Sequence, residues 1–146
     1  MAIPVTVTLE QKPDGGYKFQ YSSPDPGVVT YPDGPDGLAR IHVPHSRVVG
    51  LVQDVTLTLE RGPSVGSATF IQDPVVWANE SGLEGTPSAM TVDRESETEV
   101  VLRVINENST SEPIPHAFFL VVLMRGSSEV LSIFGSDPIL IEEPGG

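Results

Sequence analysis

Apolar and polar residues alternate with a period of two along several stretches of the chain. Near the N-terminus an apolar set faces away from a polar set: Ile3, Val5, Val7 and Leu9 against Pro4, Thr6, Thr8 and Glu10. The same alternation recurs over 17–21, 51–60 and 100–104. Because successive side chains of a strand point to opposite faces, the pattern is typical of strands with one buried face. The Pro-Asp-Gly-Gly stretch at 13–16 predicts a hairpin between the first two strands.

Weaker apolar runs predict further strands over 27–31, 38–43, 67–71, 75–78, 88–93, 130–134 and 139–141, and no window carries a helical period. This spacing predicts one all-β domain over 1–146, a two-sheet antiparallel β-sandwich of the immunoglobulin-like kind. The expected core is Val5, Val7, Leu9, Phe19, Val55, Leu57, Leu59, Val100, Leu102 and Val104.

A cupredoxin-like sandwich without copper is the alternative architecture. A strand ending at Asn106, then a loop, then His116 and Phe118 on the next strand resembles the first copper-ligand region of cupredoxins. A blue-copper site needs a cysteine thiolate, and the chain has no cysteine.

The stretch 117–124 reads Ala-Phe-Phe-Leu-Val-Val-Leu-Met and does not alternate. A strand without a polar face is covered on both sides. One cover is the opposite sheet, and the other is either the 24–37 loop or a second subunit. We expect a homodimer. The outward set is either Phe118, Leu120, Val122 and Met124, or Ala117, Phe119, Val121 and Leu123, and the sequence does not choose between them.

Composition narrows the function classes. The chain has 14 Gly, 14 Pro, no Cys and a net charge of −12. The lack of cysteine excludes disulfides, thiol nucleophiles and iron–sulfur sites. The acidic balance argues against nucleic acid and favours a polycationic or other protein partner, or simply solubility. Neither a signal-peptide pattern nor a membrane-spanning run is visible, so we expect a cytoplasmic protein with no membrane partner.

Three histidines are the candidate metal ligands. His42 and His45 are three residues apart around Pro44, and His116 or Asp36 would supply a third ligand. The plainer interpretation is that all of them are ordinary polar residues near strand ends.

The proline-rich loops around Asp25, Asp33 and Asp36 are the expected recognition surface, because sandwiches present loops at their ends. Phe118 and Phe119 are the other candidate partner-binding residues. The Asp-Gly repeat at 33–37 could suggest a calcium loop, but it lacks the spacing of one and is better read as a double turn.

Enzyme signatures are not found in the sequence. No nucleophile elbow and no phosphate-binding glycine loop is present, and nothing indicates that two aspartates meet as a catalytic pair. Trp77 with Tyr31 could stack on a sugar, whereas a single tryptophan in this setting is more typical of a sandwich core. We therefore predict a chain that is not an enzyme and has no cofactor.

The C-terminal segment Ser136-Asp137-Pro138-Ile139-Leu140-Ile141-Glu142-Glu143-Pro144 resembles the ending of the small bacterial DP-EP family, named for an Asp-Pro and a Glu-Pro of this kind. The resemblance implies a bacterial single-domain β-sandwich of unknown function and no catalytic residue.

Together these observations predict a non-enzymatic interaction or structural module. The alternatives are a metal-binding protein using His42, His45 and His116, and a carbohydrate-binding module.

Overall fold

The computed structural model describes residues 2–14, 16–34, 36–46, 48–63, 65–79, 82–83, 87, 90–125 and 131–145. Within them the chain is all-β, as expected, and contains no helix that could cross a membrane. The strands are β1 (Ala2–Gln11), β2 (Tyr17–Ser22), β3 (Val29–Thr30), β4 (Arg40–Val43), β5 (Gln53–Arg61), β6 (Ser67–Asn79), β7 (Gly82–Leu83), β8 (Met90–Arg94), β9 (Glu99–Val104), β10 (Ile114–Arg125), β11 (Leu131–Ser136) and β12 (Ile139–Glu142).

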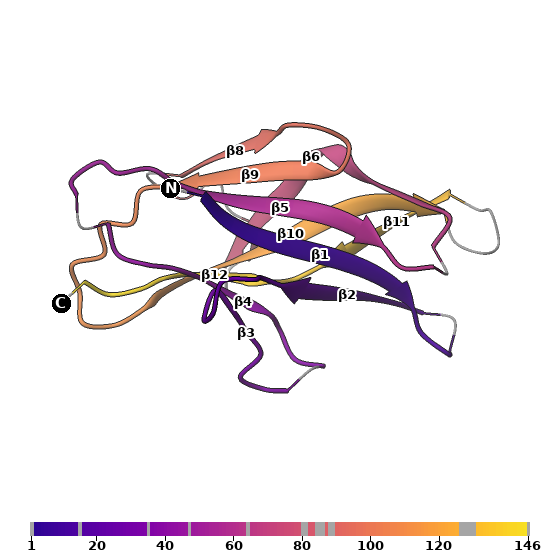
Figure 1. The fold of residues 1–146 in the computed structure, drawn as a ribbon, viewed down its shortest axis with the longest axis horizontal. Helices are drawn as coiled ribbons and strands as arrows, with labels where there is room; N and C mark the ends of the chain where they lie inside the picture. Colours follow the sequence, from indigo (N-terminus) through magenta and orange to yellow (C-terminus); the bar gives the residue numbers. More distant parts are fainter. Residues whose placement is uncertain are drawn as a thin grey trace.

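Two sheets pack face to face. The first has the order β2-β1-β5-β9-β8, and the second has the order β3-β4-β12-β10-β6-β7 with β11 also paired to β10. Figure 1 shows β1 and β5 of the first sheet crossing in front of β10 of the second. The predicted hairpin is confirmed, because β1 and β2 pair antiparallel from Gln11↔Tyr17 onward.

Both sheets are mixed, which corrects the expectation of purely antiparallel sheets. β1 runs parallel to β5, and β4 runs parallel to β12. Each of these pairs joins strands that are separated by several others along the chain. Alternation reports which face of a strand is buried but carries no information about which strand it pairs with, so the sequence pattern could not reveal the parallel pairs.

The core lies between the sheets and consists of the predicted alternating positions. Val5, Val7, Leu9, Val55, Leu57, Leu59, Val100, Leu102 and Val104 are all buried, and Phe19 is half-buried against them. The facing sheet contributes Phe70, Phe118, Leu120, Val122, Met124 and Leu140, all of them fully buried.

One strand replaces two that the sequence predicts. The stretches 67–71 and 75–78 belong to the single long strand β6. Its pairing with β10 shifts register between Leu120 and Val122, where Val75 and Phe70 are the respective partners. The Asp73-Pro74 pair therefore lies in a β-bulge, which takes up extra residues without ending the strand.

Several loops gather at one end of the sandwich. Figure 1 shows the β4–β5 loop, the β9–β10 loop and the end of β12 together at the left. Backbone hydrogen bonds join these segments: Ser46 donates to Asn106 at 2.8 Å, and Gly145 donates to Asn108 at 3.1 Å. This loop end carries most of the residues discussed below.

Candidate functional site

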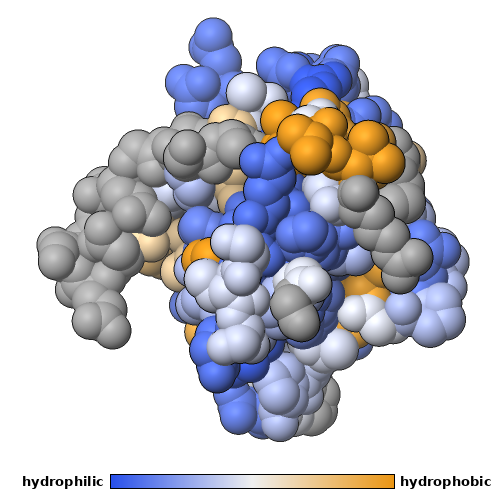
Figure 2. Space-filling view, turned by 90° about the vertical axis from the view of Figure 1, so that its left-hand side faces the viewer, coloured by the Kyte–Doolittle hydropathy of each residue, from blue (hydrophilic) through white to orange (hydrophobic). Residues whose placement is uncertain are grey.

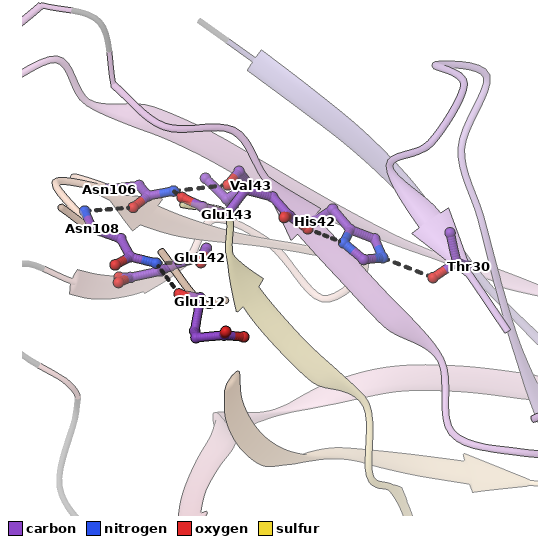
Figure 3. A network of polar contacts seen from close by, with 8 residues as sticks. All are labelled: Thr30, His42, Val43, Asn106, Asn108, Glu112, Glu142 and Glu143. Atoms are coloured by element: carbon purple, nitrogen blue, oxygen red, sulfur yellow. Dashed lines mark hydrogen bonds and ion pairs between the residues drawn. The ribbon is translucent and has the colours of Figure 1, made fainter. Parts of the chain in front are cut away.

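Two buried asparagines hold the loop end together. The Asn106 side chain is fully buried, and its amide nitrogen donates to the carbonyls of Val43 at 2.8 Å and Glu143 at 3.1 Å. The Asn108 amide likewise donates to the carbonyls of Glu112 and Glu142. Figure 3 shows both side chains between the β9–β10 loop and the ends of β4 and β12. These side chains add hydrogen bonds to carbonyls at the ends of β4 and β12, and so they fix the position of Glu143.

A hydroxyl, an imidazole and a carboxylate lie in line beside these asparagines. The Glu143 carboxylate is 2.5 Å from His42 Nδ1, and Thr30 Oγ1 is 2.7 Å from His42 Nε2 (Figure 3). When Nδ1 donates to the carboxylate, Nε2 of the neutral ring accepts from the hydroxyl. This Thr30–His42–Glu143 relay ties β3, β4 and the end of β12 across the outer face of the second sheet.

The order of groups in the relay is that of a nucleophile, a base and an orienting acid in acyl-transfer enzymes. The adjoining hollow, however, opens at the carboxylate end. It has a volume of about 350 Å³ and is lined by Pro44, His45, Glu143, Pro144 and Gly145. A molecule seated there would meet the carboxylate of Glu143 and the ring of His45 rather than the hydroxyl of Thr30. The relay therefore serves better as a cross-strand tie than as a catalytic centre.

The structure does not bring the three histidines together. His42 pairs in register with Ile141, and His116 pairs with Leu140, the next residue along β12. Since neighbouring residues of a strand face opposite sides of the sheet, His42 lies on the outer face and His116 on the inner one. Asp36 is exposed in the β3–β4 loop. Among the described residues, no three His, Cys, Asp or Glu side chains are grouped closely enough to hold a metal ion.

His116 belongs to a cluster at the inner side of the sandwich. Its Nε2 is 3.7 Å from Glu142 Oε1, and its ring meets the Trp77 ring edge-on with centroids 6.4 Å apart. Trp77 is buried against Phe118, as expected of a core residue, so neither face of its indole is free to stack on a sugar. Tyr31 lines a hollow of only about 60 Å³ with Tyr21, and such a hollow holds a few water molecules.

The acidic loops around β3 form exposed turns. Asp25, Asp33 and Asp36 all reach solvent. Gly34 donates to the Tyr31 carbonyl and Gly37 donates to the Gly34 carbonyl, which is the expected double turn. These aspartates are accessible to a partner, but among the large hydrophobic side chains described in these loops only Leu38 is exposed, at 42%.

The two phenylalanines separate across the sheet. Phe118 is fully buried in the core and cannot contact a partner, whereas Phe119 points outward and is 42% exposed. The outward set on β10 is therefore Ala117, Phe119, Val121 and Leu123, the second of the two alternatives that the sequence left open.

A turn in the β4–β5 loop presents three valines to solvent. Val48, Val49 and Val52 are 63%, 94% and 40% exposed. We call residues 48–52 the valine turn. Figure 2 looks onto this end of the molecule and shows hydrophobic side chains gathered there in one patch. Exposed valines are ordinary when scattered, but three within five residues at a loop tip form a contiguous apolar surface.

Hydrogen bonds hold the valine turn in one shape. Leu51 donates to the Val48 carbonyl at 3.1 Å, and Gly50 has a φ of 76°, as a type II turn requires at its third residue. The Gly50 amide also donates to the Glu107 carboxylate at 3.1 Å. At the base of the loop, the buried Gln53 donates to the Pro44 carbonyl at 2.7 Å. The valines are thus displayed on a preformed support.

A groove adjoins the valine turn on the first sheet. Its volume is about 380 Å³, and it is lined by Val52, Met90, Thr91, Arg103 and Ile105. The Arg103 guanidinium is already engaged by the carboxylates of Asp54, Asp93 and Glu95. The hydrogen bond to Glu95, together with the negative charges of the three carboxylates, raises the pKa of this arginine. One cation among three anions leaves the wall of the groove acidic.

The valine turn was not predicted, because Val48 and Val49 fall between predicted strands and Val52 belongs to the strand predicted over 51–60, whereas β5 begins at Gln53. Thr30 and Glu143 were not predicted as partners of His42, since they lie 12 and 101 residues away from it along the chain. The Val-Val pair before Gly50 was the available signal for the turn, because two bulky apolar residues are uncommon at a loop tip.

A comparison of the sequence with known protein families, with curated proteins and with solved structures finds no match in any of the three. The resemblance to the DP-EP family stays a prediction from nine residues.

Proposed function

We propose that this protein is a non-enzymatic interaction module, and that the valine turn with its adjoining groove is the recognition surface. The observation that carries the proposal is the exposure of Val48, Val49 and Val52 on a turn held by hydrogen bonds. A rigid apolar turn loses little conformational freedom on binding, so most of the burial energy appears as affinity.

The partner we propose is a protein segment with an apolar core and basic flanks. The apolar core would lie against Val52, Met90 and Ile105 in the groove, whose volume is in the range of ligand-sized sites. The basic flanks would meet the surplus carboxylates of Asp93 and Glu95 around Arg103. A net charge of −12 would steer such a segment toward this protein and repel acidic competitors.

We also propose an immunoglobulin-like arrangement of the sandwich, a bacterial origin, a cytoplasmic location and the absence of an enzymatic activity. The cupredoxin-like sandwich without copper, suggested by the strands around Asn106 and His116, is the alternative architecture.

A defined peptide set tests the proposed function. Peptides with one apolar core are flanked by lysine and arginine in one series and by aspartate and glutamate in the other, and binding is measured by fluorescence anisotropy. We expect the basic series to bind at least about tenfold more tightly, with affinity falling as salt rises.

Two single variants locate the binding. Val49→Asp changes the most exposed side chain of the turn, and Ile133→Asp is the matched control because Ile133 is 67% exposed on the other sheet. We expect Val49→Asp to weaken binding about tenfold or more and Ile133→Asp to leave it unchanged, since one desolvated charge costs well over 1.4 kcal/mol. Failure of every basic peptide to bind, or equal binding by both variants, would refute the proposal.

A further inference from the structure

Around β10 the outer face of the second sheet is apolar, whereas around β1 and β5 the outer face of the first sheet is polar. On β10 the outward side chains are Ala117, Phe119, Val121 and Leu123, and their large apolar register partners on neighbouring strands are Val76, Ile133 and Ile139. We call these seven residues the β10 face. Their other register partners are Ala78, Gly135 and Thr69. On the first sheet the corresponding outward positions of β1 and β5 are Thr6, Thr8, Thr56 and Thr58. Alternation of apolar and polar residues is thus kept on one sheet and lost on the other.

The β10 face is open in the described structure. Phe119 is 42% and Ile133 is 67% exposed, and Ala117 is also exposed. Charged side chains border the face: Arg125 lies at one end of β10, and Arg40 pairs in register with Ile139 at its side. An apolar centre with a polar rim is the usual anatomy of a protein–protein interface.

The area of the β10 face is that of a small dimer interface. β10 has 12 residues, which at about 3.3 Å each give a length of about 40 Å. β6 pairs with one edge of β10, and β12 and β11 pair with successive stretches of the other edge, so the face is three strands wide, which is about 14 Å at about 4.8 Å per strand. The product is about 560 Å² per chain, and two stacked copies would bury about 1,100 Å², above the roughly 1,000 Å² that a specific interface needs.

We propose that the β10 face is the interface of a homodimer. A two-fold axis would stack the face on its own copy, so that Phe119 and Ile133 of each chain are buried by the other. This surface lies on the opposite sheet from the groove beside the valine turn. The dimer would therefore leave that groove free, and the inference stands independently of the proposed function.

The mass of the protein in solution tests the dimer. Light scattering after size exclusion at about 50 μM is expected to give twice the 15.6 kDa of one chain. Since each copy carries a charge of −12, added salt is expected to strengthen the dimer by screening the repulsion, whereas it weakens the binding of basic peptides.

Variants decide which surface makes the dimer. Ile133→Asp and Phe119→Asp are expected to give the mass of a single chain while unfolding in urea as cooperatively as the wild type. Val49→Asp is the matched control and is expected to keep the dimer mass. A wild-type protein of 15.6 kDa would overturn the inference. So would a dimer that survives both β10-face substitutions, because its interface would then lie elsewhere.

Discussion

Replacing Asn106 by alanine is expected to destabilise the fold strongly, although no apolar contact of the core is removed. The Asn106 side chain makes three hydrogen bonds to backbone groups, those of Val43, Glu143 and Asn108. Val43 keeps a partner, because its carbonyl also accepts from the Glu143 amide at 3.0 Å. The Glu143 carbonyl and the Asn108 amide both lose the partner that Asn106 provides.

The expected loss follows from those two groups. A buried donor or acceptor left without a partner costs about 1–3 kcal/mol, so two of them cost about 2–6 kcal/mol. We expect a value near 3 kcal/mol, since the loop can relax in part toward water. That is a large share of the roughly 5–15 kcal/mol by which a domain of this size is stable.

Urea unfolding measures this loss as a shift of the midpoint at constant slope. Ser111→Ala is the matched control in the same loop, because Ser111 is exposed and a surface substitution changes stability by no more than about 0.5 kcal/mol. Asn106→Asp preserves the shape but directs a carboxylate at two carbonyl oxygens, so it should destabilise at least as much at pH 7. A loss below about 1 kcal/mol for Asn106→Ala would show that the asparagine does not hold the loop end together.

Three further predictions rest on other parts of the fold. Burial raises the pKa of the Tyr21 phenol well above its usual range. Above about pH 10 the phenol therefore ionises in the unfolded chain but not in the folded one. The free energy of unfolding should keep its full value below about pH 10 and fall by up to about 1.4 kcal/mol per pH unit above it. Urea titrations from pH 9 to 11 should show a shallower fall for Tyr21→Phe, and equal slopes would contradict the assignment. Gly50→Ala forces alanine into a φ of 76°, so it should cost about 1 kcal/mol and loosen the valine turn, measured as lower stability and weaker binding of basic peptides; unchanged values for both would argue against a preformed turn. Elemental analysis of tag-free protein should find no stoichiometric zinc, copper, nickel or iron, because His42 and His116 lie on opposite faces of a sheet; a full equivalent that disappears in His45→Ala would reverse that conclusion.

Local patterns of the sequence predicted the strands and the core because burial acts on each strand separately. Val5, Val7 and Leu9 lie on the buried face of β1 whichever strand pairs with it, so the alternation of apolar and polar residues alone identifies them as core residues. The parallel pairing of β1 with β5 depends instead on contacts between distant segments, which a single sequence does not display.

The candidate sites likewise depend partly on local sequence and partly on contacts between distant segments. His42 could be chosen as a candidate from its residue type, but its partners Thr30 and Glu143 are respectively 12 and 101 residues away along the chain. The missing alternation of 117–124 predicts a strand covered on both faces, but only the structure shows that Phe119 rather than Phe118 faces outward.

The most direct test of the recognition surface is a titration of isotopically labelled protein with a basic-flanked apolar peptide, followed by amide nuclear magnetic resonance. The account predicts that the largest shifts fall on the valine turn at 48–52 and on the groove residues Met90, Thr91 and Ile105. Shifts centred on the acidic loops at Asp25, Asp33 and Asp36, or the absence of any shift at millimolar peptide, would contradict it.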